Sequence, residues 1–217
     1  MRLERFQALA SLYKGLRIAV VGDFCLDRYL EIDPARAETS IETGLPVYNV
    51  ANVRAQPGGA GTVLNNLVAL GVGRIEVVGV RGDDGEGYEL QRGLEAHPSV
   101  STEHLLTAHD RRTFTYCKPL IVRPGEPPRE LNRLDTKNWT PTPHLLEQRL
   151  IESLRAVVGR CHAVIVLEQV DVAETGVVTR GLLEAIDALT DERPDVLFLA
   201  DSRRGLRGWP GVALKMN

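Results

Sequence analysis

The stretch RIAVVGD, residues 17–23, is a continuous apolar run that ends in Gly-Asp. Such a run predicts a strand that is buried on both faces of a parallel sheet. Similar runs occur further along the chain, and segments with apolar residues at helical spacing separate them. The other expected strands span residues 74–80, 163–167, 196–200 and 212–214, and the expected helices span residues 3–13, 62–70, 86–96, 143–158 and 175–189. This alternation predicts a Rossmann-like, three-layer α/β/α fold with a mostly parallel sheet.

Two segments, about 28–55 and 110–135, interrupt that alternation with short β-like pieces and turn residues such as Pro34, Gly44 and Pro46. They predict antiparallel β-structure inserted into the α/β frame. Because each insertion follows a strand, we expect a small β lid over the carboxyl ends of the sheet, where open α/β sheets bind ligands. Exposed strands of this kind tend to pair, so we also expect a homodimer through the lid.

The composition excludes several classes of protein. The 217 residues are 43% hydrophobic, which fits one globular domain spanning residues 1–217. The 26 basic and 29 acidic residues are mixed along the chain and leave a net charge of −3, which argues against nucleic acid as a partner. Neither an apolar leader nor a membrane-length segment is present, so we expect a cytoplasmic protein without membrane contact. The five histidines and three cysteines lack ligand spacing, so no metal site is expected on them.

The segment QPGGAGTVLNN, residues 56–66, places three glycines within four positions before a helical pattern. No lysine follows them, so the segment is not a P-loop, and it does not directly follow a buried strand as a dinucleotide fingerprint requires. Two interpretations remain open. The glycines either expose helix N–H groups to a polar ligand such as a sugar, or they form a tight turn between lid and helix.

The stretches VVGDFCLDRY, PGGAGTVLNNLVALG and GVRGDDGEG resemble the ribokinase-like (PfkB) carbohydrate kinases in order, spacing and residue type. The resemblance covers nearly the whole chain and implies a ribokinase-like fold. It implies that Asp27 binds the sugar and that Gly58 and Gly59 open a helix beneath it. Within the family, GDFCLDRY, LNRLD, ADSRRGL and LKMN look most like the branch that phosphorylates heptose 7-phosphate.

The resemblance extends to further candidate residues. Thr62 stands where the family usually has a sugar-binding asparagine, so substrate choice is expected to differ. Glu168 follows the apolar run AVIVL and resembles a strand-end glutamate of ribokinase itself, although a solvated edge position explains it equally well. Asp23 matches a strand-end position that a Gly-Asp turn also explains, and Asn66 is expected to be a packed helix amide. Arg112, Lys118 and Arg133 fall on the lid, where they either bind a substrate phosphate or keep an exposed edge soluble.

Asn217, at the end of LKMN, matches an asparagine that lies near the magnesium and phosphates in the family, so it is the expected cofactor-binding residue. The family's G-A-G-D turn, which carries the catalytic base, is absent from these residues, and that aspartate is expected beyond Asn217. We therefore expect the amino-terminal, sugar-binding part of a kinase that uses ATP and Mg²⁺, inactive when alone. The alternatives are a non-catalytic sugar-phosphate sensor and an NAD-binding oxidoreductase. The insertion between Asp23 and Gly58 argues against the latter.

Overall fold

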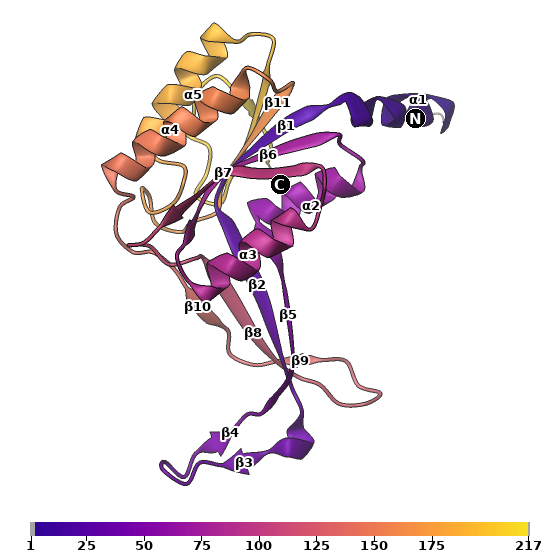
Figure 1. Cartoon of the computed structure of the whole chain (residues 1–217), viewed down its shortest axis with the longest axis vertical. Helices are drawn as coiled ribbons and strands as arrows, with labels where there is room; N and C mark the ends of the chain where they lie inside the picture. Colours follow the sequence, from indigo (N-terminus) through magenta and orange to yellow (C-terminus); the bar gives the residue numbers. More distant parts are fainter. Residues whose placement is uncertain (1–2, 217) are drawn as a thin grey trace.

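The computed structural model describes residues 3–216 and contains a central six-stranded sheet in which all neighbouring strands run parallel (Figure 1). The strand order is β13-β12-β11-β1-β6-β7. The strands are β1 (Arg17–Gly22), β6 (Arg74–Gly82), β7 (Val100–Ala108), β11 (Ala163–Glu168), β12 (Leu197–Ser202) and β13 (Ala213–Leu214). The expected parallel α/β sheet is confirmed.

Helices cover both faces of this sheet (Figure 1). Ile18 and Val20 of β1 belong to the core cluster beneath one pair of helices, whereas Ala19 and Val21 belong to the cluster beneath the other pair. This alternation follows from the two-residue period of a strand. The first pair is α2 (Ala60–Ala69) and α3 (Gly85–Glu95), and the second is α4 (His144–Val158) and α5 (Arg180–Glu192). The three-layer α/β/α architecture is therefore also confirmed.

One helix boundary and one strand differ from those expected. Helix α5 begins at Arg180 rather than Thr175, because the Thr179 side chain caps it by accepting a hydrogen bond from the Leu182 N–H. Strand β7 was not expected, since its sequence VSTEHLLTA lacks a continuous apolar run, as suits a strand at the sheet edge. The chain begins with α1 (Leu3–Leu12) and the 3₁₀ turn η1 (Tyr13–Gly15). Within residues 3–216, no helix is both long and apolar enough to cross a membrane.

A second sheet projects from the core as the lid (Figure 1). Its strand order is β10-β8-β2-β5, with β9 also paired to β8. The lid comprises β2 (Phe24–Ile32), η2 (Pro34–Arg36), β3 (Glu38–Thr39), β4 (Pro46–Val47), β5 (Val50–Gly59), β8 (Thr115–Ile121), β9 (Arg129–Glu130) and β10 (Leu134–Thr136). The expectation of antiparallel pairing throughout is wrong, because β2 and β8 are parallel. Both strands leave the core in the same direction, so their pairing is parallel.

Strand β1 continues into lid strand β2 after one residue, Asp23, instead of turning into a helix. A dinucleotide fold places its phosphates at the turn between the first strand and the first helix, so the oxidoreductase alternative has no such turn to use. From β1 the chain proceeds to β6 and β7 on one side and later to β11, β12 and β13 on the other. The carboxyl ends of β1 and β11 therefore flank the switch point where such sheets bind ligands.

Candidate functional site

A cleft of about 340 Å³ lies between the lid and the carboxyl ends of the sheet. Lid strands β2 and β8, the first turn of α2 and the segments that end β11 and β12 all contribute to it. Its lining residues are Asp27, Gly59, Thr62, Val63, Tyr116, Lys118, Arg133, Leu167, Gln169, Asp201 and Arg203. Residues far apart in the sequence thus meet where the fold predicts a ligand.

Asp27 lies on β2, near the base of the lid. Its Oδ1 atom accepts a hydrogen bond from Lys118 Nζ at 2.9 Å, and both side chains are mostly buried. Burial opposes the charge on Lys118, but its bonds to Asp27 and to the Tyr29 hydroxyl raise the pKa of the Lys118 ammonium. The pair therefore holds an oriented carboxylate and a protonated amine at the wall of the cleft.

The Asp27 carboxylate lies against Gly58. A Cβ atom on Gly58 would be 2.5 Å from Asp27 Oδ2, closer than real Cβ atoms come, so any other residue here would force the Asp27 carboxylate to move. Gly58 and Gly59 were expected to open the helix. They end strand β5, opposite Cys25 and Phe24 of β2, and lead directly into the helix, which begins at Ala60.

Gly59 is the N-cap of α2 and has φ 59°, a left-handed conformation that favours glycine. The Ala60 N–H donates to the Asp23 carbonyl at 3.0 Å, and no side chain caps the helix. Thr62 follows in the first turn, where it is exposed and lines the cleft. The positive end of the α2 dipole therefore faces the cleft.

Three cations, Lys118, Arg133 and Arg203, line the cleft. Lys118 pairs with Asp27, and Arg133 pairs with Asp135 at 2.7 Å. Arg203 has no carboxylate within ion-pair distance among residues 3–216, and its Nη1 instead donates to the Tyr116 hydroxyl at 3.0 Å. The guanidinium of Arg203 thus keeps donors for an anionic group of a ligand.

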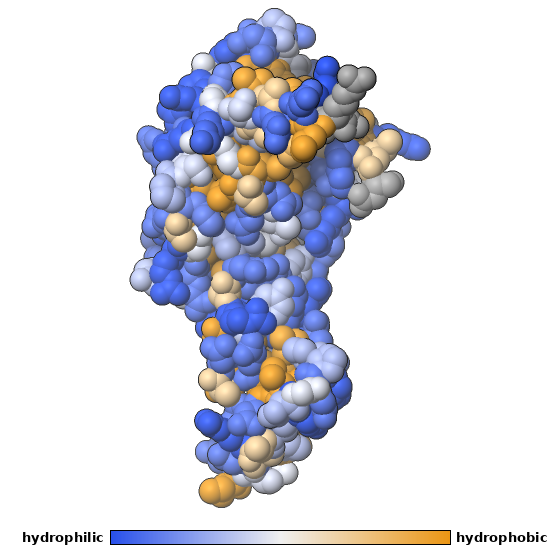
Figure 2. Space-filling model, turned by 90° about the vertical axis from the view of Figure 1, so that its right-hand side faces the viewer, coloured by the Kyte–Doolittle hydropathy of each residue, from blue (hydrophilic) through white to orange (hydrophobic). Residues whose placement is uncertain are grey.

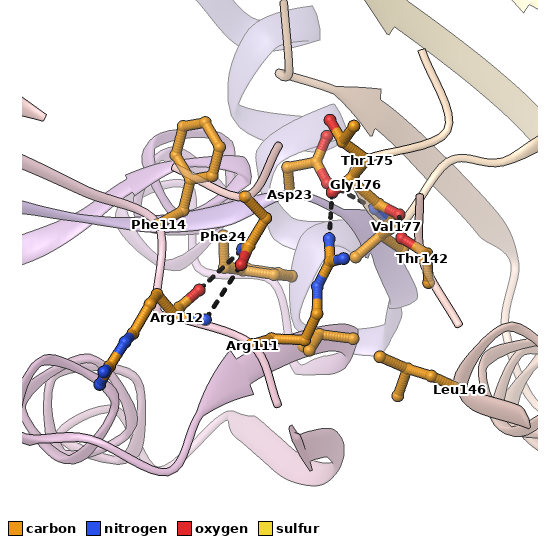
Figure 3. A pocket seen from close by; sticks show the side chains of 12 residues that line it. Asp23, Phe24, Arg111, Arg112, Phe114, Thr142, Leu146, Thr175, Gly176 and Val177 are labelled. Carbon is orange, nitrogen blue, oxygen red and sulfur yellow. Dashed lines mark hydrogen bonds between the residues drawn. The ribbon is translucent and has the colours of Figure 1, made fainter. Parts of the chain in front are cut away.

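Asp23, directly after β1, serves the scaffold beside the cleft. Its carboxylate accepts hydrogen bonds from the Gln169 N–H at 2.7 Å and the Val177 N–H at 2.6 Å. Burial raises the pKa of Asp23 to about 6 against the lowering effect of these bonds. Figure 3 shows Asp23 and Arg111 both reaching the segment around Gly176, where the Arg111 guanidinium donates to the Thr175 carbonyl. Asp23 is therefore more than a turn residue, since it ties the end of β1 to the loop after β11.

Solved structures share this fold. A possible 1-phosphofructokinase from Thermotoga maritima superposes with a TM-score of 0.61 and 15% identity over 92% of this chain and 60% of its own. Ribokinase from Giardia lamblia gives a TM-score of 0.53 and 14% identity, with coverage of 87% and 55%. The chain has the ribokinase-like fold. At these identities the structures establish the fold alone.

Curated relatives of the ribokinase-like chain carry the name bifunctional protein HldE. The protein from Gluconobacter oxydans is 29% identical over 200 residues, which cover 91% of this chain and 39% of the relative. The protein from Hyphomonas neptunium is 31% identical over 200 residues, with coverage of 92% and 38%. The ribokinase-like chain thus spans about two fifths of the curated relatives it matches. No model of a known protein family matches the chain.

The structure does not bring Glu168 into the cleft. Glu168 ends β11 but lines a separate cavity, where its carboxylate accepts a hydrogen bond from Ser202 and pairs with Arg204 at 2.8 Å. The alternative of a solvated edge is wrong too, since Glu168 is only 4% exposed. The neighbouring residue Gln169 lines the cleft instead, because successive residues point in opposite directions.

Two other residues singled out from the sequence, Arg112 and Asn66, also lie outside the cleft. Arg112 is exposed in the loop before β8, where its backbone N–H donates to Asn138 Oδ1 at 3.0 Å, and it does not line the cleft. Asn66 is exposed, so its expected packing is wrong, and Asn65 is the partly buried amide, with its Nδ2 donating to the Pro57 carbonyl. Asn217 lies outside the described residues.

Sequence reasoning missed Tyr116, Gln169, Asp201 and Arg203 of the ribokinase-like chain. Arg203 and Asp201 belong to ADSRRGL after a predicted strand, so the rule that selected Glu168 applied to them equally. Tyr116 carried no such signal, because its position in the lid depends on the pairing of β8 with β2. Across residues 3–216, no group of three or more His, Cys, Asp or Glu side chains is arranged to hold a metal ion.

Proposed function

We propose that the protein containing this chain transfers the γ-phosphate of Mg-ATP to a hydroxyl of a sugar phosphate, with heptose 7-phosphate-like acceptors favoured. The ribokinase-like fold and the HldE relatives support a kinase. Because the chain spans about two fifths of those relatives, we propose that it supplies the acceptor-binding part. The ATP-contacting elements and the catalytic aspartate are proposed to follow Asn217.

The observation that carries this proposal is one cleft that combines the Asp27 carboxylate with the cations Lys118, Arg133 and Arg203. A carboxylate accepts hydrogen bonds from neighbouring sugar hydroxyls, whereas ammonium and guanidinium groups bind phosphate. Lys118 and Arg133 are already paired with Asp27 and Asp135, whereas Arg203 keeps guanidinium donors that a neutral sugar does not require. The composition of the cleft therefore favours an acceptor that already bears a phosphate.

In the proposed reaction, residues of this chain bind and orient the acceptor. Asp27 fixes hydroxyl groups, and the cations anchor the phosphate at the other end of the acceptor, so that one free hydroxyl points out of the cleft. When bound, ATP would supply the phosphoryl group, and the magnesium ion would neutralise part of the negative charge on the phosphates. The acceptor hydroxyl loses its proton to the proposed aspartate base as its oxygen bonds to phosphorus and the bond to ADP breaks. Thr62 and the α2 amides support the geometry around this acceptor.

The test uses the full-length protein with sedoheptulose 7-phosphate and with unphosphorylated sedoheptulose. We expect ATP-dependent turnover of the phosphorylated sugar, loss of its binding in Asp27→Ala, and a loss of about 10- to 100-fold in affinity in Arg203→Met. Arg129→Met, on an exposed lid arginine outside the cleft, is the matched control and should behave as wild type. Binding without turnover supports the sensor alternative, and equal affinity for both sugars contradicts the phosphate assignment.

We further propose that two copies associate through their lids. Figure 2 shows apolar surface at the far end of the lid, where Ile41, Leu45 and Tyr48 are exposed. Exposed apolar residues on short strands favour pairing with another chain. Sedimentation of the full-length protein should give a dimer that Ile41→Lys weakens.

Because the proposed donor is ATP, we place the protein in the cytoplasm.

A further inference from the structure

Three cations surround the ring of Tyr116 on the wall of the cleft. The Cζ atom of Arg133 lies 4.6 Å from the ring centroid, that of Arg203 lies 5.8 Å away, and Nζ of Lys137 also lies 5.8 Å away. Tyr116 is itself only 6% exposed and packs edge-on against Phe114 at 5.6 Å. A rigid aromatic ring therefore holds cations from different elements at fixed distances.

The three cations differ in their carboxylate partners. Arg133 pairs with Asp135, and Lys137 pairs with Asp171 at 2.6 Å. Arg203 lacks a carboxylate within ion-pair distance among residues 3–216, and its guanidinium is held by the Tyr116 hydroxyl at 3.0 Å and by the ring. Burial raises the pKa of Tyr116, so its hydroxyl stays neutral and accepts this bond.

This contact joins the two sides of the cleft. Tyr116 lies on lid strand β8, whereas Arg203 follows core strand β12 and its backbone N–H donates to the Glu168 carbonyl at 3.1 Å. The Tyr116 hydroxyl therefore connects the lid to the core through the Arg203 guanidinium, which keeps further N–H donors for a ligand. An arginine held in this way before the ligand arrives loses less side-chain entropy on binding than a free one.

We infer that Tyr116 is a positioning residue, which sets the Arg203 guanidinium for the phosphate of the acceptor through its hydroxyl. The inference rests on the proposed function, because it assumes a phosphorylated acceptor in this cleft. It goes further by assigning selectivity for that phosphate to a hydroxyl that need not touch the ligand. Tyr116 thus acts on the affinity for the acceptor and leaves the phosphoryl-transfer step alone.

Tyr116→Phe in the full-length protein removes the hydroxyl and keeps the ring. We expect the KM for sedoheptulose 7-phosphate to rise about tenfold, with kcat and the KM for unphosphorylated sedoheptulose within about twofold of wild type. Tyr88→Phe is the matched control, because Tyr88 is 66% exposed on α3 and also lies near an arginine, Arg92. Tyr88→Phe should change neither kcat nor the KM for either sugar.

A double-variant cycle separates positioning through Arg203 from a general loss of structure. In an Arg203→Met background, Tyr116→Phe should have no further effect on the KM for the phosphorylated sugar. If Tyr116→Phe does not fold, Arg203→Lys replaces it, since a lysine keeps the charge but loses the planar fork, and the same selective rise in KM is expected.

Two results overturn the inference: an equal rise in KM for both sugars, or additive effects of the two substitutions. A wild-type protein that shows no preference for the phosphorylated sugar instead overturns the proposed function, and the inference with it. A preference that Tyr116→Phe leaves intact rejects the inference and retains the proposed function.

Discussion

The Asp27 carboxylate and the Lys118 ammonium lie 2.9 Å apart and link two parallel strands of the lid at the wall of the cleft. The two side chains are 16% and 18% exposed, so solvent screens the pair only in part. The candidate sugar-binding carboxylate is thus held in place before any ligand arrives.

Removing Lys118 should leave a mostly buried carboxylate without its partner. We expect Lys118→Met to lower the free energy of unfolding by about 1–2 kcal/mol, because the ion pair is partly desolvated. Urea unfolding of wild type, Lys118→Met, Asp27→Asn and the double variant measures the coupling, which should be about 1 kcal/mol. Additive losses would show that the 2.9 Å contact contributes nothing to stability.

Gly58→Ala should displace Asp27, because the new Cβ atom would lie 2.5 Å from Asp27 Oδ2. We expect a loss of about 1–3 kcal/mol in stability and at least about tenfold weaker acceptor binding by the full-length protein. Gly85→Ala is the control, since a Cβ there meets no atom within 4 Å. Equal behaviour of the two variants in calorimetric titration contradicts the prediction.

Asp23 should make the chain less stable as the pH rises through its titration. Its folded-state pKa, about 6, lies above the ordinary aspartate value of 3.8, so the folded state binds more protons between these values. The contribution of Asp23 to folding therefore falls as the pH rises from about 4 to above 6, by on the order of 2 kcal/mol. Asp23→Asn cannot titrate, so the stability of the variant relative to wild type should improve over this range. A difference that does not vary between pH 4 and 7 in urea unfolding argues against it.

Arg28 should anchor the base of the lid to the core. Its guanidinium pairs with Glu86 at 3.3 Å and with Glu89 at 3.1 Å, both on α3. We expect Arg28→Met to cost about 1 kcal/mol of stability and to speed amide exchange in β2 and β5. Arg36→Met, which removes an exposed pair with Asp33 at 3.2 Å, should leave exchange in those strands unchanged. Unaltered exchange in Arg28→Met shows that other contacts hold the lid.

The parallel sheet and its helical layers could be predicted from the sequence alone. Short continuous apolar runs such as Arg17–Asp23 are typical of strands covered on both faces, and this local pattern can be recognised without knowing which strands pair. The motifs around Asp27 and Gly58 were also readable, since the residues that make the close contact occur in recognisable local patterns. The edge strand β7 lacked an apolar run and was therefore missed.

Which of these side chains share a cavity depends on the way the whole chain folds. Glu168 and Gln169 are adjacent in sequence, yet the strand places Gln169 at the cleft and Glu168 against Arg204. The partnership of Tyr116 with Arg203 joins residues 87 positions apart. It depends on the parallel pairing of β8 with β2, which sequence patterns do not specify. Strand pairing and side-chain direction arise from contacts across the whole chain, and for that physical reason the composition of the cleft could not be predicted from the sequence.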